Sequence, residues 1–410
     1  MSIIQGTSKA AGGAGYEIEN SLRLDGTGDM SRSVGSDGNL REWSWSFWVK
    51  RSGLGTNGGL GFNIGGTYLN ASNRSIVRFY SSGNGTDDFL WAEYVGGAWK
   101  EDQWTDAQYR DPSAWSHILL VWNTDGGTTP RARRYINGVQ VTELGSSPAA
   151  AANADSATNK SGTFQLFDQA GYPGREFEGY CAEMHFVDGT ALAPTDFGEF
   201  NTDGVWIPIK TSGITYGSNG FYLDFADSSA LGNDVSGNNN DFTSSGLATT
   251  DQMLDTPTLN ASTFNPLWAG AGLSDGNLVA TASGNAYQWA TSTFAIDDGG
   301  KYVCEFQKSA GTFGYVGIFQ IGNHTATTGN NYMYAINVGT GEVVKNASVL
   351  VDVGAAPANS LMRIEYDGSN DTIKIFDDGA ETFPASTGVS NTVGLTGQNS
   401  LHFGCAPYGS

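Results

Sequence analysis

Short apolar runs alternate with clusters of Gly, Asn, Asp and Ser along the whole chain, and no stretch carries apolar residues at helical spacing over three turns. In one such run, Trp43, Trp45, Phe47 and Val49 occupy every second position. Because side chains alternate between the two faces of a strand, this period predicts a central strand that buries large aromatic rings on one face. Trp48 falls on the other face, where it either packs under a loop or marks an exposed concave face.

Two hairpin patterns, far apart in the chain, follow one plan. The segment 115–142 holds two strand-like runs, a Gly-bearing loop and an Asn137-Gly138 turn, and the segment 361–379 repeats this order up to Asp378-Gly379. Asn-Gly or Asp-Gly between β-forming residues is a strong hairpin signal, since a type I′ turn needs positive φ at both central positions. The repetition predicts two β-sandwich domains of the same general plan.

The predicted fold class is all-β, with two antiparallel sandwiches joined by an irregular segment. The predicted parts are an N-terminal arm or anchor at 1–20, a first sandwich at 21–205, a junction at 206–264 and a second sandwich at 265–410. The arm is rich in Gly and Ala and has too few large apolar side chains to fold alone. We therefore expect it to be ordered only against another chain, with Ile3 and Ile4 as assembly contacts.

Composition agrees with an all-β reading and excludes some partners. The 410 residues include 57 Gly, 11 Trp, 17 Tyr and 21 Phe, enough aromatic side chains for sizeable cores. A net charge of −21 repels phosphate, so no nucleic-acid partner is expected. No apolar run approaches the ~20 residues of a membrane span, and the start lacks the pattern of a signal peptide. Synthesis and assembly in a cytoplasm are therefore expected.

The cysteines and histidines show no metal or redox spacing. Cys181, Cys304 and Cys405 have no CxxC pattern, so buried free thiols are expected, with a contact between Cys304 and Cys405 left open. The four histidines are isolated, which argues against a zinc site.

Catalytic patterns are also missing from the sequence. A retaining glycosidase needs two carboxylates about 5–5.5 Å apart. The nearest acidic set is Glu176, Glu178 and Glu183, but the odd offset from Glu178 to Glu183 places them on opposite faces of a regular strand. A G-x-S-x-G nucleophile elbow does not occur. The sequence predicts a protein that is not an enzyme.

Four motifs in the first predicted sandwich resemble a known family. They are Trp43-Ser-Trp-Ser-Phe-Trp-Val-Lys50, Trp115-Ser-His-Ile118, Tyr135-Ile-Asn-Gly-Val139 and Glu178-Gly-Tyr-Cys-Ala-Glu183. Their order resembles the laminin-G / concanavalin A-like jelly-roll family. The segment 300–306, together with 315–318, resembles the SPRY pattern, which belongs to the same sandwich class. The resemblance thus implies two concanavalin A-like jelly rolls.

The segment 196–242 is similar to a stretch of large virion or tail-fibre-like proteins of marine tailed bacteriophages. This resemblance implies a structural or adhesin protein of a phage virion, such as a tail fibre. It implies other virion proteins as partners and a homo-oligomer, with a trimer favoured. The alternatives are a head-decorating virion protein and a free lectin-like carbohydrate-binding protein.

Two kinds of site are predicted. Trp91, Tyr94, Trp99 and Trp104 lie in a Trp-rich region around Gly96-Gly97, read as a loop, where exposed rings would stack on a bacterial surface glycan. Laminin-G-like domains often hold Ca²⁺ with loop oxygens, and hard cations prefer such ligands. The Ca²⁺ candidates, which ordinary turns also explain, are Asp25 and Asp29, or Asn233, Asp234, Asn238 and Asp241. No other cofactor is expected.

Overall fold

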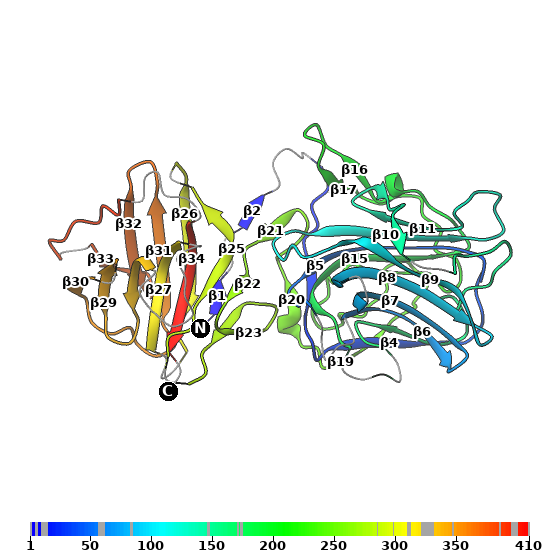
Figure 1. Cartoon of the computed structure of the whole chain (residues 1–410), viewed down its shortest axis with the longest axis horizontal. Coiled ribbons are helices and arrows are strands. Elements are labelled where there is room, and N and C mark those ends of the chain that lie inside the picture. Colours follow the sequence, from blue (N-terminus) through cyan, green and yellow to red (C-terminus); the bar gives the residue numbers. More distant parts are fainter. Residues whose placement is uncertain are drawn as a thin grey trace. The chain divides into compact units, whose positions relative to one another are not determined.

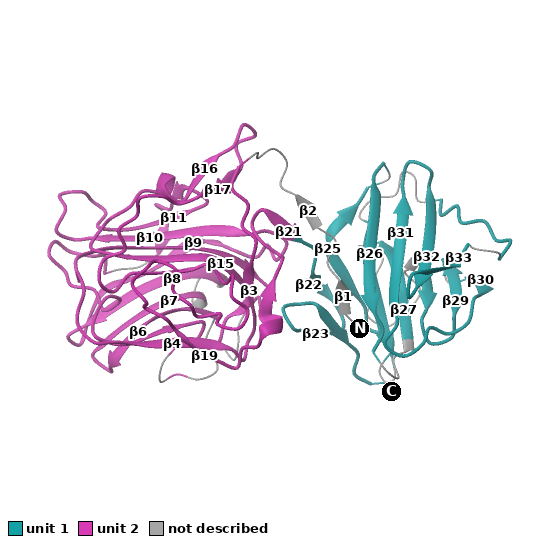
Figure 2. Cartoon of the chain, turned by 180° about the vertical axis from the view of Figure 1, so that it is seen from behind, with its two compact units in different colours: residues 1–7, 261–410 teal, residues 8–260 magenta. Residues whose placement is uncertain are grey.

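The computed structural model of the chain forms two compact units, residues 1–7 with 261–410 (unit 1) and residues 8–260 (unit 2) (Figures 1 and 2). The structure describes all residues except 1, 5–6, 10–14, 56–61, 83–84, 146–147, 170–171, 173–174, 285, 298, 310–312, 321–331, 347, 385–386, 395–400 and 409–410. Throughout the described part, strands dominate and the helical elements are the 3-10 turns η1 (Pro194–Asp196) and η2 (Thr249–Asp251). The all-β prediction is confirmed.

Unit 2 contains antiparallel sheets that enclose one core. The first sheet has the order β12 (Val139–Gln140), β11 (Ala132–Ile136), β10 (Ser116–Asn123), β5 (Glu42–Arg51), β15 (Glu178–Asp188), β3 (Ser21–Asp25), β20 (Gln252–Met253), with β18 (Phe221–Leu223) also on β15. The second has the order β13 (Leu144–Gly145), β9 (Ala98–Gln108), β8 (Gly85–Val95), β7 (Asn73–Ser82), β6 (Phe62–Asn70), β14 (Gly162–Leu166), β4 (Asp29–Val34), β19 (Thr243–Ser245). Short pairs are β16 (Gly198–Phe200) with β17 (Trp206–Pro208), and β2 (Thr7–Lys9) with β21 (Leu259–Ala261).

The core of unit 2 lies between these two sheets and is largely aromatic. Trp43 of β5 stacks on Trp122 of β10 at 6.3 Å and meets Trp91 of β8 edge-on at 5.5 Å. All three are fully buried, so the alternation seen in the sequence does mark the inner face of β5. Burial of such rings contributes a few kcal/mol each by area. Trp48, on the outer face, is also buried, in a cluster that includes Trp206; it packs under another segment.

Unit 1 is built in the same way from antiparallel sheets. One has the order β23 (Gly272–Ser274), β24 (Val279–Thr281), β1 (Ser2–Ile4), β26 (Lys301–Gln307), β31 (Leu361–Asp367), β32 (Thr372–Asp377), β33 (Ala380–Phe383). The other has the order β22 (Phe264–Ala269), β25 (Ala290–Ile296), β34 (Leu401–Tyr408), β27 (Phe313–Gln320), β28 (Tyr332–Asn337), β29 (Glu342–Lys345), β30 (Ser348–Asp352).

Both predicted hairpin turns are confirmed. Asn137 and Gly138 have φ of 48° and 76°, and Asp378 and Gly379 have φ of 45° and 82°. Each pair has the two positive φ values that a type I′ turn requires. The first turn joins β11 to β12 and the second joins β32 to β33. The duplicated hairpin is therefore a real feature of both units.

The predicted junction at 206–264 is not a separate segment, because most of it belongs to unit 2. It supplies β17, β18, β19 and β20. It also supplies Asp255, which is fully buried and accepts hydrogen bonds from Lys50 Nζ and Trp115 Nε1, both at 2.9 Å. The Gly/Asn/Asp composition gave no indication of this role, because such residues hydrogen-bond backbone groups in turns and do not form long strands.

The prediction for the N-terminal arm was wrong in its described part. Ser2–Ile4 form β1, which pairs with β26 of the same chain. The Tyr16 hydroxyl donates to Glu183 Oε1 at 3.1 Å, and Ile18 is buried within unit 2. The backbones of Ile3 and Ile4 are thus placed, whereas their side chains lie outside the described residues. In the structure, these parts are held by contacts within the same chain.

The cysteines are buried and free, as expected. Burial raises the pKa of the Cys181 thiol and of the Cys405 thiol, so the thiolate is disfavoured at both. Among the residues that the structure describes, no helix is long and apolar enough to cross a membrane.

Candidate functional site

The region predicted as a Trp-rich loop is a β-hairpin, not a loop. β8 and β9 are joined by a turn at Gly96 and Gly97, with φ of 62° and 78°. The turn is held by the N–H of Gly97, which donates to the carbonyl of Ser72, and by the N–H of Gly96, which donates to Asn73 Oδ1. Two residues with positive φ favour glycine, so the Gly-Gly pair specifies a tight turn.

Three of the four predicted ligand residues come together on the outer face of β7, β8 and β9. Ile76, Leu90 and Ala92 form a small apolar layer there, against which Trp99 and Trp104 pack. Tyr94 lies opposite Trp99 in the register. We call the set Arg74, Tyr94, Trp99 and Trp104 the aromatic surface. Its four side chains are half-buried, so each keeps an accessible edge or face.

Tyr94 and Trp99 are the centre of the aromatic surface. Their ring centroids lie 4.6 Å apart in an edge-to-face arrangement at 61°. The Arg74 guanidinium carbon lies 4.3 Å from the centroid of Tyr94 and 5.3 Å from that of Trp99. Arg74 Nη1 also donates to the carbonyl of Ala71. These contacts hold the Arg74 guanidinium against both rings. Cation–π pairs of this kind stabilise by about 0.5–1 kcal/mol at exposed sites.

An acidic side chain, Asp102, lies beside the rings, and the guanidinium of Arg74 is stacked on them. Asp102 is paired with Ala92 across the hairpin and lies on β9 between Trp99 and Trp104. Burial raises the pKa of Asp102 above its ordinary value, and the nearby charge of Arg78 counteracts this. The surface thus combines aromatic rings with a carboxylate and a guanidinium.

Trp104 lies at the edge of the aromatic surface that adjoins β13. Gly145 of β13 is its partner in the register, and a Cβ at Gly145 would lie 2.4 Å from Trp104 Nε1. The absence of a side chain at this position therefore gives room for the indole ring. Any larger residue there would displace Trp104.

Trp91 was wrongly predicted as a ligand residue. It is fully buried between the sheets, where it contacts Trp43 and Trp122. Its Nε1 donates to Glu93 Oε1 at 3.0 Å. Burial raises the pKa of Glu93 to about 7, against the hydrogen bonds that Trp91 and Thr158 donate to the carboxylate. These groups belong to the core.

The predicted calcium ligands Asp25 and Asp29 make other contacts. Asp25 Oδ1 accepts hydrogen bonds from the N–H of Thr27 at 3.0 Å and from its hydroxyl at 2.7 Å, which is an Asx turn. Asp29 Oδ1 accepts one from Gln165 Nε2 at 3.4 Å. Across the described part of the chain, no three His, Cys, Asp or Glu side chains lie close enough to share a metal ion. The described residues do not fit the predicted site.

The alternative calcium residues are used to fold a loop. Asp234 accepts hydrogen bonds from the N–H groups of Tyr222 and Asn240, both at 2.8 Å. Its own N–H donates to Asp241 Oδ1 at 2.8 Å, and Asn238 donates to the carbonyls of Gly217 and Gly220. These oxygens are occupied by backbone donors, which explains the Gly/Asx composition without a metal.

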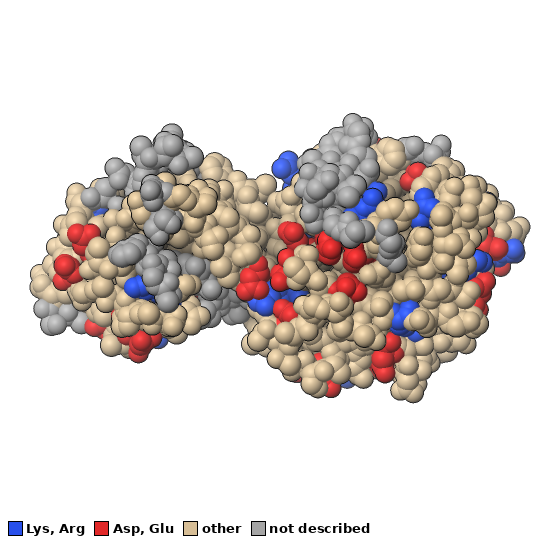
Figure 3. Space-filling view, turned by 90° about the horizontal axis from the view of Figure 1, so that it is seen from below, with Lys and Arg blue, Asp and Glu red and all other residues tan. Residues whose placement is uncertain are grey.

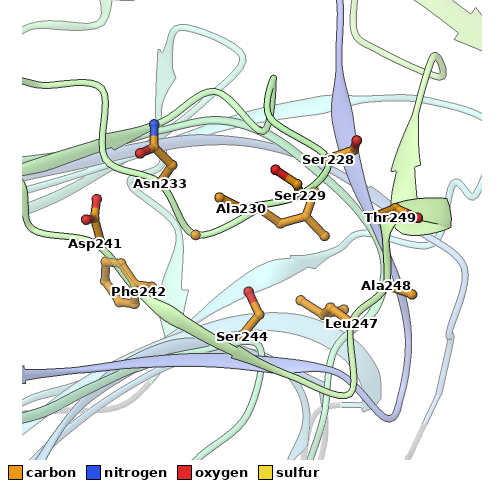
Figure 4. A pocket seen from close by; sticks show the side chains of 12 residues that line it. Ser228, Ser229, Ala230, Asn233, Asp241, Phe242, Ser244, Leu247, Ala248 and Thr249 are labelled. Carbon is orange, nitrogen blue, oxygen red and sulfur yellow. The ribbon is translucent and has the colours of Figure 1, made fainter.

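A pocket of about 410 Å³ lies beside this loop. In Figure 4, Phe242, Ser244 and Leu247 lie along one side of it, and Ser229 and Ala230 lie opposite. Asn233 and Asp241, two of the alternative calcium residues, also line it. Small hydroxyl and methyl groups dominate the lining, and Asp241 is its one ionisable side chain among the described residues.

Glu183 is the most buried of the acidic residues considered for catalysis, and two tyrosine hydroxyls hold its carboxylate. It lies in a β-bulge of β15, where the register shifts between Ala182 and His185, and its φ is 47°. Its Oε1 accepts a hydrogen bond from Tyr16, and its Oε2 accepts one from Tyr222 at 2.7 Å. The bulge breaks the regular alternation, so the parity argument from Glu178 to Glu183 does not apply here.

Charge is unevenly distributed. On the face of unit 2 that Figure 3 shows, acidic side chains gather around a few basic ones. This agrees with 42 acidic against 21 basic residues. The aromatic surface differs from the mainly acidic composition of the chain, because the cation Arg74 is stacked on the rings of Tyr94 and Trp99.

Comparisons with known proteins give one family match and several weak structural likenesses. No curated protein matches the chain. Among solved structures, domains LG4-5 of the mouse laminin alpha1 chain are similar at 10% identity and a TM-score of 0.34, covering 97% of this chain and 85% of that one. A SAP-like pentraxin from Limulus polyphemus is similar at 14% identity and a TM-score of 0.31, covering 43% of this chain and 80% of that one.

Tailspike protein 2 of bacteriophage CBA120 is similar at 11% identity and a TM-score of 0.29, covering 41% of this chain and 25% of that one. Likenesses of this size carry no information on ligand or activity. A family model gives a more specific result, since residues 25–196 match the laminin G-type model of the concanavalin A-like lectin/glucanases superfamily. The aromatic surface, at positions 74–104, lies within the segment that matches this superfamily.

Proposed function

We propose that the chain is a non-catalytic, glycan-binding structural protein of a tailed-phage virion, in a tail fibre or a similar appendage. The glycan part is carried by one observation, the half-exposed rings of Tyr94 and Trp99 with Arg74 stacked on both. Such rings would be expected in the core if their role were packing alone. They lie instead on the outer face of the hairpin, on a layer of their own.

The chemistry of this surface suits a sugar. A pyranose ring has C–H faces that pack on aromatic rings and hydroxyl groups that need hydrogen-bond partners. Ligand sites of this kind combine aromatic lining with a few placed polar groups. Tyr94 and Trp99 supply the rings, and Asp102 and Arg74 supply an acceptor and a donor beside them. A bacterial surface glycan is the proposed ligand class.

The virion part of the proposal rests on the resemblance of segment 196–242 to phage virion proteins. It is tested by mass spectrometry of purified virions, which should detect this polypeptide at structural stoichiometry. Its absence from virions would contradict the virion role and leave the free lectin-like alternative. Labelling of the chain on virions, followed by electron microscopy, separates a tail appendage from a head-decorating protein.

The glycan part is tested independently on an array of bacterial surface glycans with the purified full-length chain. We expect binding to a restricted set of glycans. Binding that is equal for all glycans, or absent, would contradict a specific glycan-binding role. The SPRY-like character of residues 265–410 and the trimeric state stay predictions.

A further inference from the structure

The pocket beside the Gly/Asx loop lies in a part of unit 2 that the family match does not cover. Its lining residues fall within 228–249, whereas the family model matches residues 25–196. They come from the loop that follows β18, from β19 at the edge of the second sheet, and from the residues that lead into η2. The volume of about 410 Å³ falls within the range of small-molecule sites, about 300–1,000 Å³. The pocket is therefore large enough for a small ligand.

The walls of the pocket are held by hydrogen bonds within the chain. The N–H of Phe242 donates to the carbonyl of Gly232 at 2.8 Å. A Cβ at position 232 would overlap the carbonyl oxygen of Phe242, so glycine permits this close approach of the two segments. On the other side, the N–H of Ala248 donates to Asp251 Oδ2 at 2.7 Å. These bonds fix both walls, so the pocket is pre-formed, as small-molecule sites usually are.

The polar side chains of the lining differ in how the fold uses them. The hydroxyl of Ser229 donates to Asp227 Oδ1 at 2.6 Å and so stabilises the loop. Four other polar side chains of the lining form no hydrogen bond to any residue that the structure describes: Ser228, Asn233, Ser244 and Thr249. Figure 4 shows the Ser244 hydroxyl directed across the pocket toward the loop that carries Ala230. Hydroxyls and carboxamides both donate and accept, so this set suits a ligand rich in hydroxyl groups.

The charge of the lining limits the ligand class further. Asp241 is the one ionisable side chain among the described lining residues, and its Oδ1 accepts the N–H of Asp234 at 2.8 Å. A carboxylate in the wall repels anionic ligands such as uronates and phosphorylated sugars. Leu247 is half-buried and adds apolar surface on which the C–H groups of a sugar ring can pack. The lining therefore favours a neutral sugar.

We propose that this pocket is a second binding site of unit 2, which takes one neutral sugar residue independently of the aromatic surface. Hydroxyls of the sugar pair with the serine, threonine and asparagine side chains of the lining, and its C–H face contacts Leu247. The aromatic surface lies on β7, β8 and β9 and shares no residue with the pocket. The proposal therefore does not rest on the glycan role of Tyr94 and Trp99.

The test measures binding of free monosaccharides to the full-length chain by saturation-transfer NMR. The probes are glucose, galactose, mannose and N-acetylglucosamine at millimolar concentration, with glucuronate as the anionic counterpart of glucose. We expect saturation transfer to at least one neutral sugar and none to glucuronate. No transfer to any of the four neutral sugars would overturn the proposal. Transfer to glucuronate as strong as to the best neutral probe would overturn it as well.

Three variants locate the bound sugar. Ala230→Trp fills the pocket from an exposed position of its wall, and we expect it to abolish transfer. The matched control, Ala226→Trp, places the same side chain at an exposed position of the same loop outside the lining, and it should bind as the parent does. Ser244→Ala removes one hydroxyl without adding volume and should weaken binding by about threefold to tenfold.

The melting temperature of each variant shows whether the fold is retained. If Ala230→Trp lowers it strongly, Ser244→Ala alone decides the outcome. Binding by Ser244→Ala that equals that of the parent, at an unchanged melting temperature, would overturn the proposal, because the sugar would then bind elsewhere on the chain. That result would leave the role of the aromatic surface intact, since Trp99→Ala tests it separately on the glycan array.

Discussion

The indole N–H of Trp206 donates to Nδ1 of His117 at 3.1 Å, inside unit 2. An indole nitrogen only donates, so Nδ1 of His117 must be the unprotonated nitrogen. The proton is therefore on Nε2, which lies 2.8 Å from Ser46 Oγ and donates to it. Trp206 belongs to the segment that the sequence assigned to a junction, and this contact connects it to β10 and β5.

The neutral state of His117 predicts acid sensitivity of unit 2. Burial lowers the pKa of His117 to about 3. In the unfolded chain, the imidazole takes up a proton as pH falls below about 6.5, while the folded state does not. The contribution of His117 is therefore complete above this pH and declines below it. Between pH 6.5 and 5, we expect a loss of about 1.6 kcal/mol in the free energy of unfolding.

Chemical unfolding at several pH values checks this, with His117→Gln as the comparison. The variant should be less stable at pH 7, because Trp206 and Ser46 lose their partner. Its stability should also change less between pH 6.5 and 5. An unchanged acid slope in the variant would show that another group causes the sensitivity.

The buried Lys50–Asp255 pair predicts that the segment around position 255 is essential to unit 2. Both side chains are fully buried, and their charges lie 2.9 Å apart. Burial lowers the pKa of Lys50, and Asp255 counteracts this. Asp255→Ala removes the counter-ion of the buried Lys50 charge and should cost about 3–5 kcal/mol in unfolding free energy. Asp125→Ala removes one of the two exposed partners of Arg41, which keeps Asp155, and should cost less than about 1 kcal/mol.

If residues 206–260 were only a connector, the two alanine variants would unfold at similar denaturant concentrations. The full-length chain is used for both, and fluorescence of the unit 2 tryptophans reports the transition.

The two type I′ turns provide a matched pair of glycine substitutions. Gly138 and Gly379 both have positive φ, so alanine at either position should cost about 1–2 kcal/mol from backbone strain. A Cβ at Gly379 meets nothing within 4 Å, whereas one at Gly138 would lie 2.3 Å from the Trp206 ring. Gly138→Ala should therefore destabilise its unit more than Gly379→Ala does. Thermal unfolding of each variant measures this, and equal losses would contradict the packing of Trp206 on the turn.

Local pattern predicted part of this structure. The alternation around Trp45 and the two Asx-Gly turns were sufficient for the sandwich class, because period and turn chemistry are local properties. The same rule could have separated Trp91 from Tyr94, since residues three apart on a strand lie on opposite faces. It could not have placed Trp99 beside Trp104, because a register shift in the hairpin brings them to one face.

Contacts between residues far apart in the sequence could not be predicted from local pattern. The partners of Ser2 lie at Val279 and Gln307, and the partner of Lys50 lies at Asp255. No local sequence feature indicates which distant strand or carboxylate a residue will meet. The junction was missed for the same reason, as its contacts are with strands far away in sequence.

The most direct test of the glycan-binding surface compares Trp99→Ala with Trp268→Ala on an array of bacterial surface glycans. Trp99 belongs to the aromatic surface, whereas Trp268 is 47% exposed in unit 1 and lies outside it. We predict that Trp99→Ala loses at least tenfold in apparent affinity, consistent with about 1.4 kcal/mol or more from one aromatic contact, while its melting temperature stays near that of the parent chain. Trp268→Ala should bind as the parent does. Unchanged binding by Trp99→Ala, with a large fall in melting temperature, would show that this ring only packs and would contradict the proposed surface.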